Sequence, residues 1–457
     1  MMALVLPALG LASSMASSMA VSSAAELQAQ LNAAIAARAP TFTIPAGTYN
    51  FSTANLNVSG ATSLLLVADG ATALFRGAAG VNITNCEALH VRGLSITYES
   101  PVPHGRRGVP GITYNVFNSS SVLSEDITIF RAPFFAVTAF NGGGGHTFRR
   151  FNLPGGTAPD PGPCPYPHQR DAFHFSDMRR GVTLEDSVAS DFGDDFFNSH
   201  NTIMLVLARE SPSSLLIINP HVQNVRWREG WWLNTVYGTN SVLENVGGGD
   251  TMSFFAPVNV TSVDSADFAP RPRSAAPCVV AGATERVGDA TVLAAASALA
   301  SSFARSYGTV GFDASDVWRV QFTVPLPHAV VQGSLVNVDS FSTPGTIVRN
   351  NTFNNTRYNL GRFKSNGGRI VNNTFSRAGV PNLEITPLLQ YFEGNLPTVR
   401  DVVVEGNVIT GEGAFPIHCS PFCSNACPYG NCSKCPDCGH DSAWAVNITL
   451  SGNTVNP

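Results

Sequence analysis

The sequence predicts an all-β fold: a parallel β-helix with an N-terminal capping helix and an inserted small antiparallel β domain. Short β-prone runs separated by Asn and Gly recur along the chain. The last of them resemble one another, as in IVRNNTF at 347–353 and IVNNTF at 370–375, whereas residues 202–339 break the repeat. A repeated β unit is typical of a solenoid, in which each coil buries its apolar face only against neighbouring coils.

The N-terminal residues predict export of the protein. Residues 1–20 carry no charged side chain, contain an apolar run at 3–9 and end on Ser18-Met19-Ala20, a small-residue pattern typical of signal-peptide cleavage. The apolar run is too short to span a bilayer, so we expect no membrane span. We therefore expect a signal peptide over 1–20, a secreted or extracellular protein, and glycosylation at some of its many Asn-x-Ser/Thr sequons.

The β-helix is expected in two parts, 25–201 and 340–457. Residues 25–38 have helical periodicity, with Leu27, Leu31 and Ile35 on one face, and this helix would shield the first coil. The expected β runs are 89–98, 121–130, 182–189, 346–353, 369–375, 401–409 and 445–455. Between the two parts, 202–339 holds alternating runs at 214–218 and 317–324 and a helical stretch at 294–304. We interpret 202–339 as an inserted, β-rich, barrel-like domain.

Composition and charge exclude several classes of partner. Charged residues make up 13% of the chain, against roughly a quarter in an average soluble domain. The net charge is -5 and the pI is near 6.0, which provides no basic surface for nucleic acid or for anionic lipid. A neutral small or polymeric substrate suits this balance better than a polyanion does.

Six of the nine cysteines lie in a Pro/Gly-rich loop at 419–438; Cys86, Cys164 and Cys278 lie elsewhere. The six are Cys419, Cys423, Cys427, Cys432, Cys435 and Cys438. In an exported protein we expect two or three disulfides here, with a connectivity that the sequence does not define. The alternative is a zinc site formed by Cys432, Cys435, Cys438 and His440.

Three aspartates are the candidate catalytic residues. Asp171 precedes the Asp194-Asp195 pair by 23 residues, so a coil of about 23 residues would stack these carboxylates on one wall of strands about 4.8 Å apart. Repulsion among clustered carboxylates raises the pKa of one member, as a general acid requires. Adjacent residues on a regular strand face opposite sides, so we expect a break at Gly193 and a turn beside Asp171. The alternative for Asp194-Asp195 is a solvated turn.

Several polar and aromatic residues are candidate substrate contacts. His174, Asn198 and His200 accompany the aspartates, and Arg362 and Lys364 would lie exposed on one face of a later strand. Both histidines and the Arg362/Lys364 pair have the alternative of being ordinary surface residues. The tryptophans Trp227, Trp231 and Trp232 could stack on a sugar, although burial in the inserted domain suits them better.

Several of these segments resemble a known family of enzymes. The helix followed by IPAGTY at 44–49 resembles the start of right-handed parallel β-helix proteins of the pectate-lyase-like superfamily. The runs DAFHF at 171–175 and GDDFFNSH at 193–200 resemble glycoside hydrolase family 110, inverting α-1,3-galactosidases whose β-helix carries inserted β-barrels. GDTMSFF at 249–255 and GRFKS at 361–365 are further similarities. Family 28 polygalacturonases share the Asp, Asp-Asp, His and Arg-x-Lys order and are the nearest alternative.

The resemblance implies a secreted glycoside hydrolase that cleaves a terminal α-galactoside with inversion. It implies Asp194 as the general acid and Asp171 with Asp195 as the pair that activates water, with no cofactor and no metal in this reaction. Two alternatives stay open. A polysaccharide lyase would use calcium-binding acids and an Arg or Lys base, and a noncatalytic β-helix would only bind carbohydrate.

Overall fold

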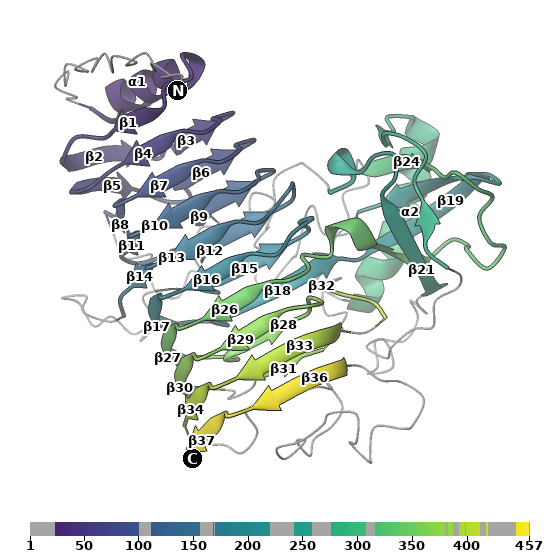
Figure 1. Ribbon diagram of the computed structural model, residues 1–457. Coiled ribbons are helices and arrows are strands. Elements are labelled where there is room, and N and C mark those ends of the chain that lie inside the picture. Colours follow the sequence, from purple (N-terminus) through teal and green to yellow (C-terminus); the bar gives the residue numbers. More distant parts are fainter. Residues whose placement is uncertain are drawn as a thin grey trace, which may run out of the picture.

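The computed structural model shows a parallel β-helix, which confirms the predicted fold class (Figure 1). The structure describes residues 23–99, 111–155, 168, 170–219, 242–257, 276–307, 316–379, 383–386, 393–397, 399–411, 417–418 and 445–456. Their coils stack from the N-terminal helix to the C-terminal strands, and an inserted sheet lies to one side (Figure 1). The predicted signal peptide, the Cys-rich loop and the three tryptophans at 227, 231 and 232 lie outside the described residues.

Three parallel sheets, here named A, B and C, form the walls of the helix. Sheet A comprises β1 (Thr41–Thr43), β4 (Leu65–Val67), β7 (His90–Arg92), β10 (Leu123–Glu125), β13 (Thr147–Arg149), β16 (Thr183–Glu185), β26 (Ile347–Arg349), β29 (Arg369–Val371), β33 (Val399–Glu405) and β36 (Ala445–Ser451). Sheet B comprises β2 (Gly47–Ser52), β5 (Ala71–Phe75), β8 (Ser95–Tyr98), β11 (Thr128–Ile129), β14 (Asn152–Leu153), β17 (Val188–Phe192), β27 (Thr352–Thr356), β30 (Thr374–Ala378), β34 (Val408–Thr410) and β37 (Thr454–Asn456).

Sheet C carries the candidate site. It comprises β3 (Leu56–Ser59), β6 (Val81–Thr84), β9 (Ile112–Phe117), β12 (Phe135–Phe140), β15 (Phe173–Ser176), β18 (Phe197–Thr202), β28 (Gly361–Phe363), β31 (Leu383–Ile385) and β35 (Ile417–His418). A further short strand, β32 (Glu393–Gly394), pairs antiparallel with β18. Most coils therefore supply one strand to each sheet.

Each run that the sequence analysis identified contains a strand of sheet A, a tight turn and the start of a strand of sheet B. In the run 346–353, β26 and β27 flank Asn350, whose φ of 57° lies in the left-handed region that Asn tolerates. Phenylalanines from neighbouring coils stack in the core, with ring centroids 5.1 Å apart for Phe196 and Phe353 and 5.2 Å for Phe353 and Phe375. The self-similar sequence therefore reflects a repeated turn and a continuous core.

Buried asparagines join the later coils at this same corner. Asn351, Asn373, Asn407 and Asn453 occupy one position in four successive coils. The side chain of Asn373 accepts from the backbone N–H of Asn351 at 3.0 Å and donates to the side-chain oxygen of Asn407 at 2.9 Å. Repetition of this pattern satisfies buried backbone groups at the turn.

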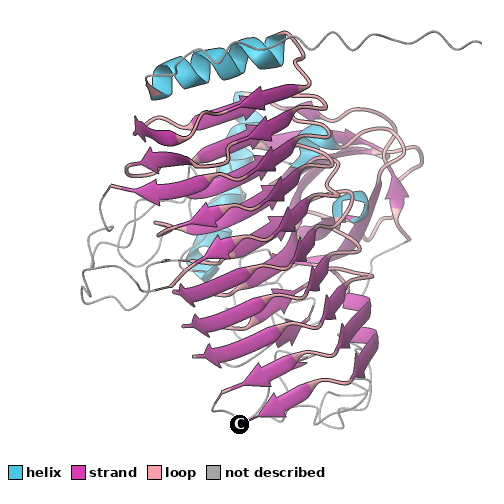
Figure 2. Cartoon of the chain, turned by 60° about the vertical axis from the view of Figure 1, so that its left-hand side comes forward, coloured by secondary structure: helices cyan, strands magenta, loops and turns pink. Residues whose placement is uncertain are grey.

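Helix α1 (Ala24–Ala36) lies across the N-terminal end of the stack (Figure 2). The Ser23 side chain caps it by accepting a hydrogen bond from the Glu26 N–H, and Leu27 and Leu31 are buried against the first coil. The helix therefore caps the β-helix, as its periodicity predicts. No helix in the described part of the chain is long and apolar enough to span a membrane.

The insertion between β18 and β26 contains a seven-stranded antiparallel sheet and a helix. Its elements are β19 (Met204–Ser211), β20 (Ser214–Ile218), η1 (Val242–Asn245), β21 (Thr251–Pro257), β22 (Cys278–Val279), β23 (Glu285–Arg286), α2 (Ala290–Tyr307), β24 (Val317–Gln321), β25 (Ser334–Val338) and η3 (Asp339–Phe341). A bridge between Val280 and Phe322 brings the β22 edge to β24, so the sheet curls back on itself. The inserted domain has two buried hydrophobic clusters. Phe254 and Val320 lie in the first, and α2 packs against the second through Ala296.

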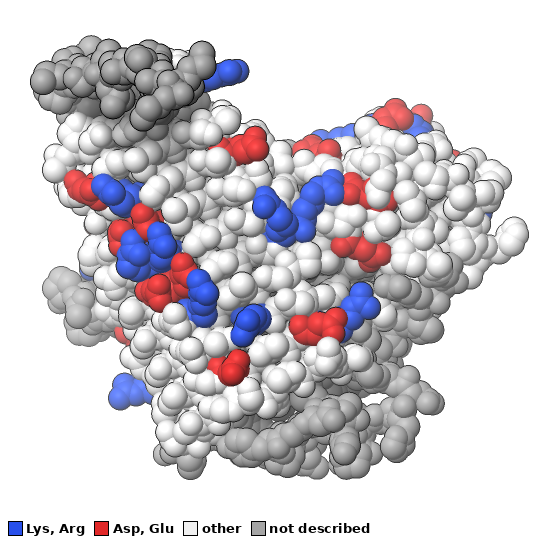
Figure 3. Space-filling view, viewed as in Figure 1, with Lys and Arg blue, Asp and Glu red and all other residues white. Residues whose placement is uncertain are grey.

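Charged side chains form a ladder along sheet A (Figure 3). Arg149 donates to Glu125 at 2.5 Å, and Arg349 donates to Glu185 at 2.5 Å. These ion pairs join successive coils at the surface, away from the candidate site on sheet C. Cys86 and Cys278, the two cysteines within the described residues, are buried free thiols.

Candidate active site

A column of polar residues on the outer face of sheet C forms the centre of the candidate site. In the strand register, His174 pairs with Asn198, Asn198 with Arg362, and Arg362 with Glu384. The residues that alternate with this column, including Phe173 and Phe363, lie in the core. Strand alternation therefore places His174, Asn198 and Arg362 in line on the opposite side, as three of the predicted substrate contacts require.

The candidate aspartates lie where sheet C strands begin. Asp171 is two residues before β15, and Asp194-Asp195 occupy a bend between the end of β17 at Phe192 and the start of β18 at Phe197. The predicted break at Gly193 is thus confirmed. In the register, Phe173 pairs with Phe197, so this coil is 24 residues long rather than about 23, and Asp171 aligns with Asp195 rather than with Asp194.

The structure brings the three carboxylates together. One oxygen from each of Asp171, Asp194 and Asp195 lies within 4.8 Å of the others. Asp171 and Asp195 are buried, whereas the Asp194 side chain is 18% exposed and forms the solvent-facing member. Inverting glycosidases typically separate their two carboxyl groups by about 6.5–9.5 Å and retaining enzymes by about 5–5.5 Å. The spacing of single oxygens does not choose between these two geometries.

Different neighbours hold the adjacent aspartates. The Asp195 carboxylate accepts from the backbone N–H of Asn359 at 2.9 Å and from its side-chain amide at 3.0 Å, and its other oxygen lies 3.2 Å from Arg362 Nε. Asp194 instead pairs with Arg170 at 2.6 Å. The bend therefore lets Asp195 bond to the next coil while Asp194 faces the solvent.

The buried carboxyls favour protonation. Burial raises the pKa of Asp171 well above its usual range, and the negative charges of Asp194 and Glu393 raise it further. Burial also raises the pKa of Asp195 well above its usual range, although the positive charge of Arg362 acts in the opposite direction. Both shifts favour the protonated form of these carboxyls, and acid catalysis at a sugar requires a protonated group.

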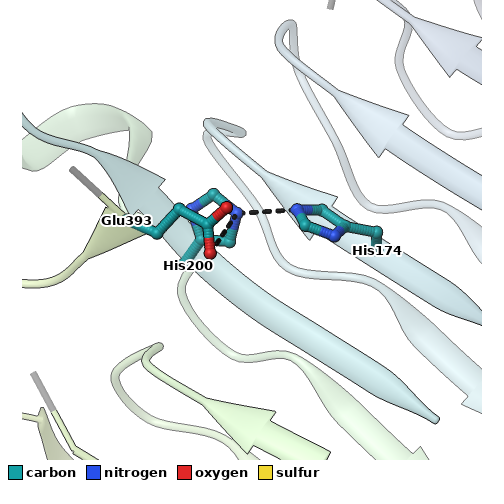
Figure 4. Close-up of side chains that lie close together, drawn as sticks. All are labelled: His174, His200 and Glu393. Atoms are coloured by element: carbon teal, nitrogen blue, oxygen red, sulfur yellow. Dashed lines mark hydrogen bonds and ion pairs between the residues drawn. The ribbon is translucent and has the colours of Figure 1, made fainter. Parts of the chain in front are cut away.

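A chain of close contacts leads from Asp171 along the sheet. The Asp171 carboxylate lies 2.7 Å from His174 Nδ1, and His174 Nε2 lies 2.8 Å from His200 Nε2. On the far side, His200 Nδ1 donates to the backbone carbonyl of Asn201 at 2.8 Å. Figure 4 shows the two imidazoles on neighbouring strands, with Glu393 beside His200. Burial lowers the pKa of His174 to about 4.

Lys364 does not lie exposed as predicted, and His200 is not a surface residue, which was the alternative to its predicted substrate contact. Both are fully buried, and Lys364 Nζ and His200 Nε2 lie 3.5 Å and 3.8 Å from the Glu393 carboxylate. Asn198 donates to the same carboxylate at 3.2 Å. Arg362 does reach solvent in part, with its side chain 17% exposed. Exposure of Arg362 and Lys364 was inferred from strand alternation. That pattern does not account for the inserted sheet and strand β32, which pack beside β18.

Four residues of the site were not identified from the sequence: Arg170, Asn359, Glu384 and Glu393. Glu384 follows Arg362 by one coil of 22 residues, and this spacing could have identified it. Arg170 adjoins Asp171, but adjacency alone does not predict an ion pair with Asp194. Glu393 reaches the site through an antiparallel pairing of β32 that follows no repeat, so no sequence signal located it.

Two groups of described residues have donor atoms close enough to hold a metal ion. The first is the carboxylate cluster, whose oxygen donors suit a hard cation such as calcium. The second is His174, His200 and Glu393, whose two nitrogens and one oxygen suit zinc. The two groups share no residue, and the contact of Asp171 with His174 Nδ1 at 2.7 Å joins them.

The chain was compared with protein families, curated proteins and solved structures. No protein-family model matches the sequence, and no curated protein matches it. Among solved structures, endo-xylogalacturonan hydrolase from Aspergillus tubingensis is 9% identical, with a TM-score of 0.35 over 94% of this chain and 89% of that one. The A-module of a mannuronan C-5 epimerase from Azotobacter vinelandii is also 9% identical, with a TM-score of 0.27 over 95% of this chain and 93% of that one.

Proposed function

We propose that the protein is a secreted glycoside hydrolase that cleaves a terminal α-galactoside with inversion of configuration. The observation that carries the proposal is the carboxylate cluster, in which two buried acids with raised pKa values adjoin the solvent-facing Asp194. Acid and base catalysis at a glycosidic bond requires a protonated carboxyl and an ionised carboxyl that flank the bond. The sugar class, the linkage and the inversion rest on the family resemblance of the sequence.

In the proposed reaction, Asp194 protonates the departing glycosidic oxygen because it is the member of the cluster that faces solvent. Asp171 and Asp195 orient the attacking water and take up its proton. The raised pKa values of Asp171 and Asp195 favour a proton on one of these two carboxyls, and the proposed reaction passes that proton to Asp194, which leaves an ionised carboxylate to take up the proton of water. Arg362 and Asn198, in line with His174 on sheet C, would bind sugar hydroxyls.

The roles can be separated by comparing leaving groups. We expect Asp194→Asn to reduce hydrolysis of an unactivated α-galactosyl disaccharide by about 10²–10⁴-fold. The loss should be much smaller with a nitrophenyl α-galactoside, because nitrophenolate departs without protonation. Asp171→Asn and Asp195→Asn should lose activity on both substrates, since water activation is needed for each.

Asp186 provides a matched control. It lies in the turn between sheets A and B of the same coil and bonds to Asn350 at 3.2 Å, away from sheet C. Asp186→Asn should therefore keep the wild-type rate on both substrates. Wild-type activity of Asp194→Asn on the disaccharide would refute the proposed role of Asp194.

A polysaccharide lyase is the second candidate function. It is favoured by the cluster of three carboxylates, which could hold calcium, with Arg362 Nε 3.2 Å from Asp195. Incubation of the full chain with polygalacturonate, with and without calcium, separates the two candidates. A calcium-dependent unsaturated product would favour the lyase, whereas a reducing end without unsaturation would favour a hydrolase.

A further inference from the structure

We infer that His174, His200 and Glu393 form a buried site for a divalent transition-metal cation of the zinc class (Figure 4). The three residues come from β15, β18 and β32. Their donor atoms lie within 4.8 Å of one another, and all three residues are buried. Two imidazole nitrogens and a carboxylate are a ligand set that zinc takes in proteins. This inference does not depend on whether the protein hydrolyses a glycoside.

The hydrogen bonds around the two imidazoles direct both Nε2 lone pairs inward. A carbonyl oxygen only accepts hydrogen bonds, so His200 Nδ1 carries the proton that it donates to Asn201. In the neutral imidazole, Nε2 is then unprotonated and offers a lone pair. If the Asp171 carboxylate accepts a hydrogen bond from His174 Nδ1, then Nε2 of the neutral His174 ring also offers a lone pair. These two lone pairs would face each other at 2.8 Å, an arrangement that a shared cation makes favourable.

Each proposed ligand also has a partner that orients it. Asp171 binds His174, the Asn201 carbonyl binds His200, and Asn198 donates to the Glu393 carboxylate. Metal-binding histidines typically donate their second N–H to a carboxylate or a backbone carbonyl, and metal-binding carboxylates are in turn hydrogen-bonded. The surroundings of all three residues therefore follow the pattern of a metal site.

The local charge balance favours a cation. The ionisable side chains that interact here comprise five carboxyls and three bases, so the cluster would carry two excess negative charges if every group were ionised; the carboxyls are Asp171, Asp194, Asp195, Glu384 and Glu393, and the bases are Arg170, Arg362 and Lys364. A divalent ion would balance this excess.

A metal-free arrangement gives the competing explanation of the same distances. A protonated Asp171 could donate to His174 Nδ1, and His174 Nε2–H could then donate to His200 Nε2. This chain of protons satisfies both rings without an ion. The two explanations differ in whether zinc content depends on these residues.

The test loads the full chain with zinc, dialyses it exhaustively and measures the zinc that remains bound by inductively coupled plasma mass spectrometry. We expect wild type to retain one more zinc per chain than His174→Gln. Glu393→Gln, which keeps the shape of the side chain, should bind zinc at least about tenfold more weakly, and Asp171→Asn about 10–100-fold more weakly. His90→Gln is the matched control, because His90 is a partly exposed histidine on sheet A that pairs with Glu125.

The comparison between variants separates this site from zinc held by the Cys-rich loop at 419–438. Zinc bound there would be equal in wild type and all four variants, whereas the proposed site contributes a difference of one equivalent. Cobalt substitution distinguishes them further, because thiolate ligands give strong ultraviolet charge-transfer bands that nitrogen and oxygen ligands lack. Equal zinc content in wild type, His174→Gln and Glu393→Gln would overturn the inference in favour of the shared proton.

Discussion

Replacement of Arg362 tests the electrostatic design of the site most sharply. Its Nε lies 3.2 Å from Asp195 and 3.2 Å from Glu384, and its side chain is mostly buried. Arg362→Gln would leave two carboxylates without this neutralising cation. Removal of one partner from a buried ion pair costs about 3–5 kcal/mol of unfolding free energy. Arg349→Gln is the control, since Arg349 is half-exposed and its pair with Glu185 should contribute less than about 1 kcal/mol.

The cost of Arg362→Gln should depend on pH. In the folded wild type, burial already raises the pKa of Asp195, and Arg362 opposes this rise. Without Arg362 the folded pKa moves further above the unfolded value of about 3.9. Such a group contributes stability that is fully present below the unfolded pKa and is lost as pH rises through the folded pKa. The variant should therefore be closest to wild type in acid and furthest from it at neutral pH.

Urea unfolding followed by circular dichroism, at several pH values, measures both effects for Arg362→Gln and Arg349→Gln. The reasoning would be refuted if the two variants lost the same free energy. A cost of Arg362→Gln that stayed constant from pH 5 to about 8 would also contradict it, because the uncompensated carboxylates would then not be the cause.

Two further predictions concern stability. Asn373→Ala should lower the free energy of unfolding by at least about 2 kcal/mol, because it removes the acceptor of the buried Asn351 N–H and the donor to Asn407; Asn354→Ala, at a partly exposed asparagine, is its control in the same urea assay. Burial lowers the pKa of Lys364, so the unfolded chain binds more protons between the folded pKa and about 10.4, and stability should rise with pH across that window. Lys364→Met should abolish this rise in the thermal midpoint, and an unchanged rise would assign it to other groups.

The sequence predicted the solenoid because sheets A and B repeat the same local chemistry. A strand, an Asn in a left-handed turn and a second strand recur as in 347–353 and 370–375, so each run carries its own structural signal. Sheet C has no such self-similarity, because its outward column changes from His174 to Asn198 to Arg362 in successive coils. The face that varies is the face that carries the candidate site.

The aspartates were identifiable because their spacing nearly equals the length of one coil. The sequence did not identify which aspartate of the pair aligns with Asp171, because a difference of one residue in coil length decides between Asp194 and Asp195. The strand register gives Asp195. Burial of Lys364 and the arrival of Glu393 depend on how a distant segment packs beside β18, and no periodicity encodes that packing. Local sequence therefore specified the walls, and tertiary packing specified the surroundings of the site.

The most direct measurement of the proposed function follows purified protein by proton nuclear magnetic resonance with linkage-defined α-galactosides and polygalacturonate. The proposed function predicts release of β-galactose from a terminal α-galactoside, at a rate that Asp194→Asn reduces by about 10²–10⁴-fold and Asp186→Asn leaves unchanged. Release of α-galactose would contradict inversion. Absence of hydrolysis of every substrate by the wild-type chain would contradict the hydrolase proposal itself.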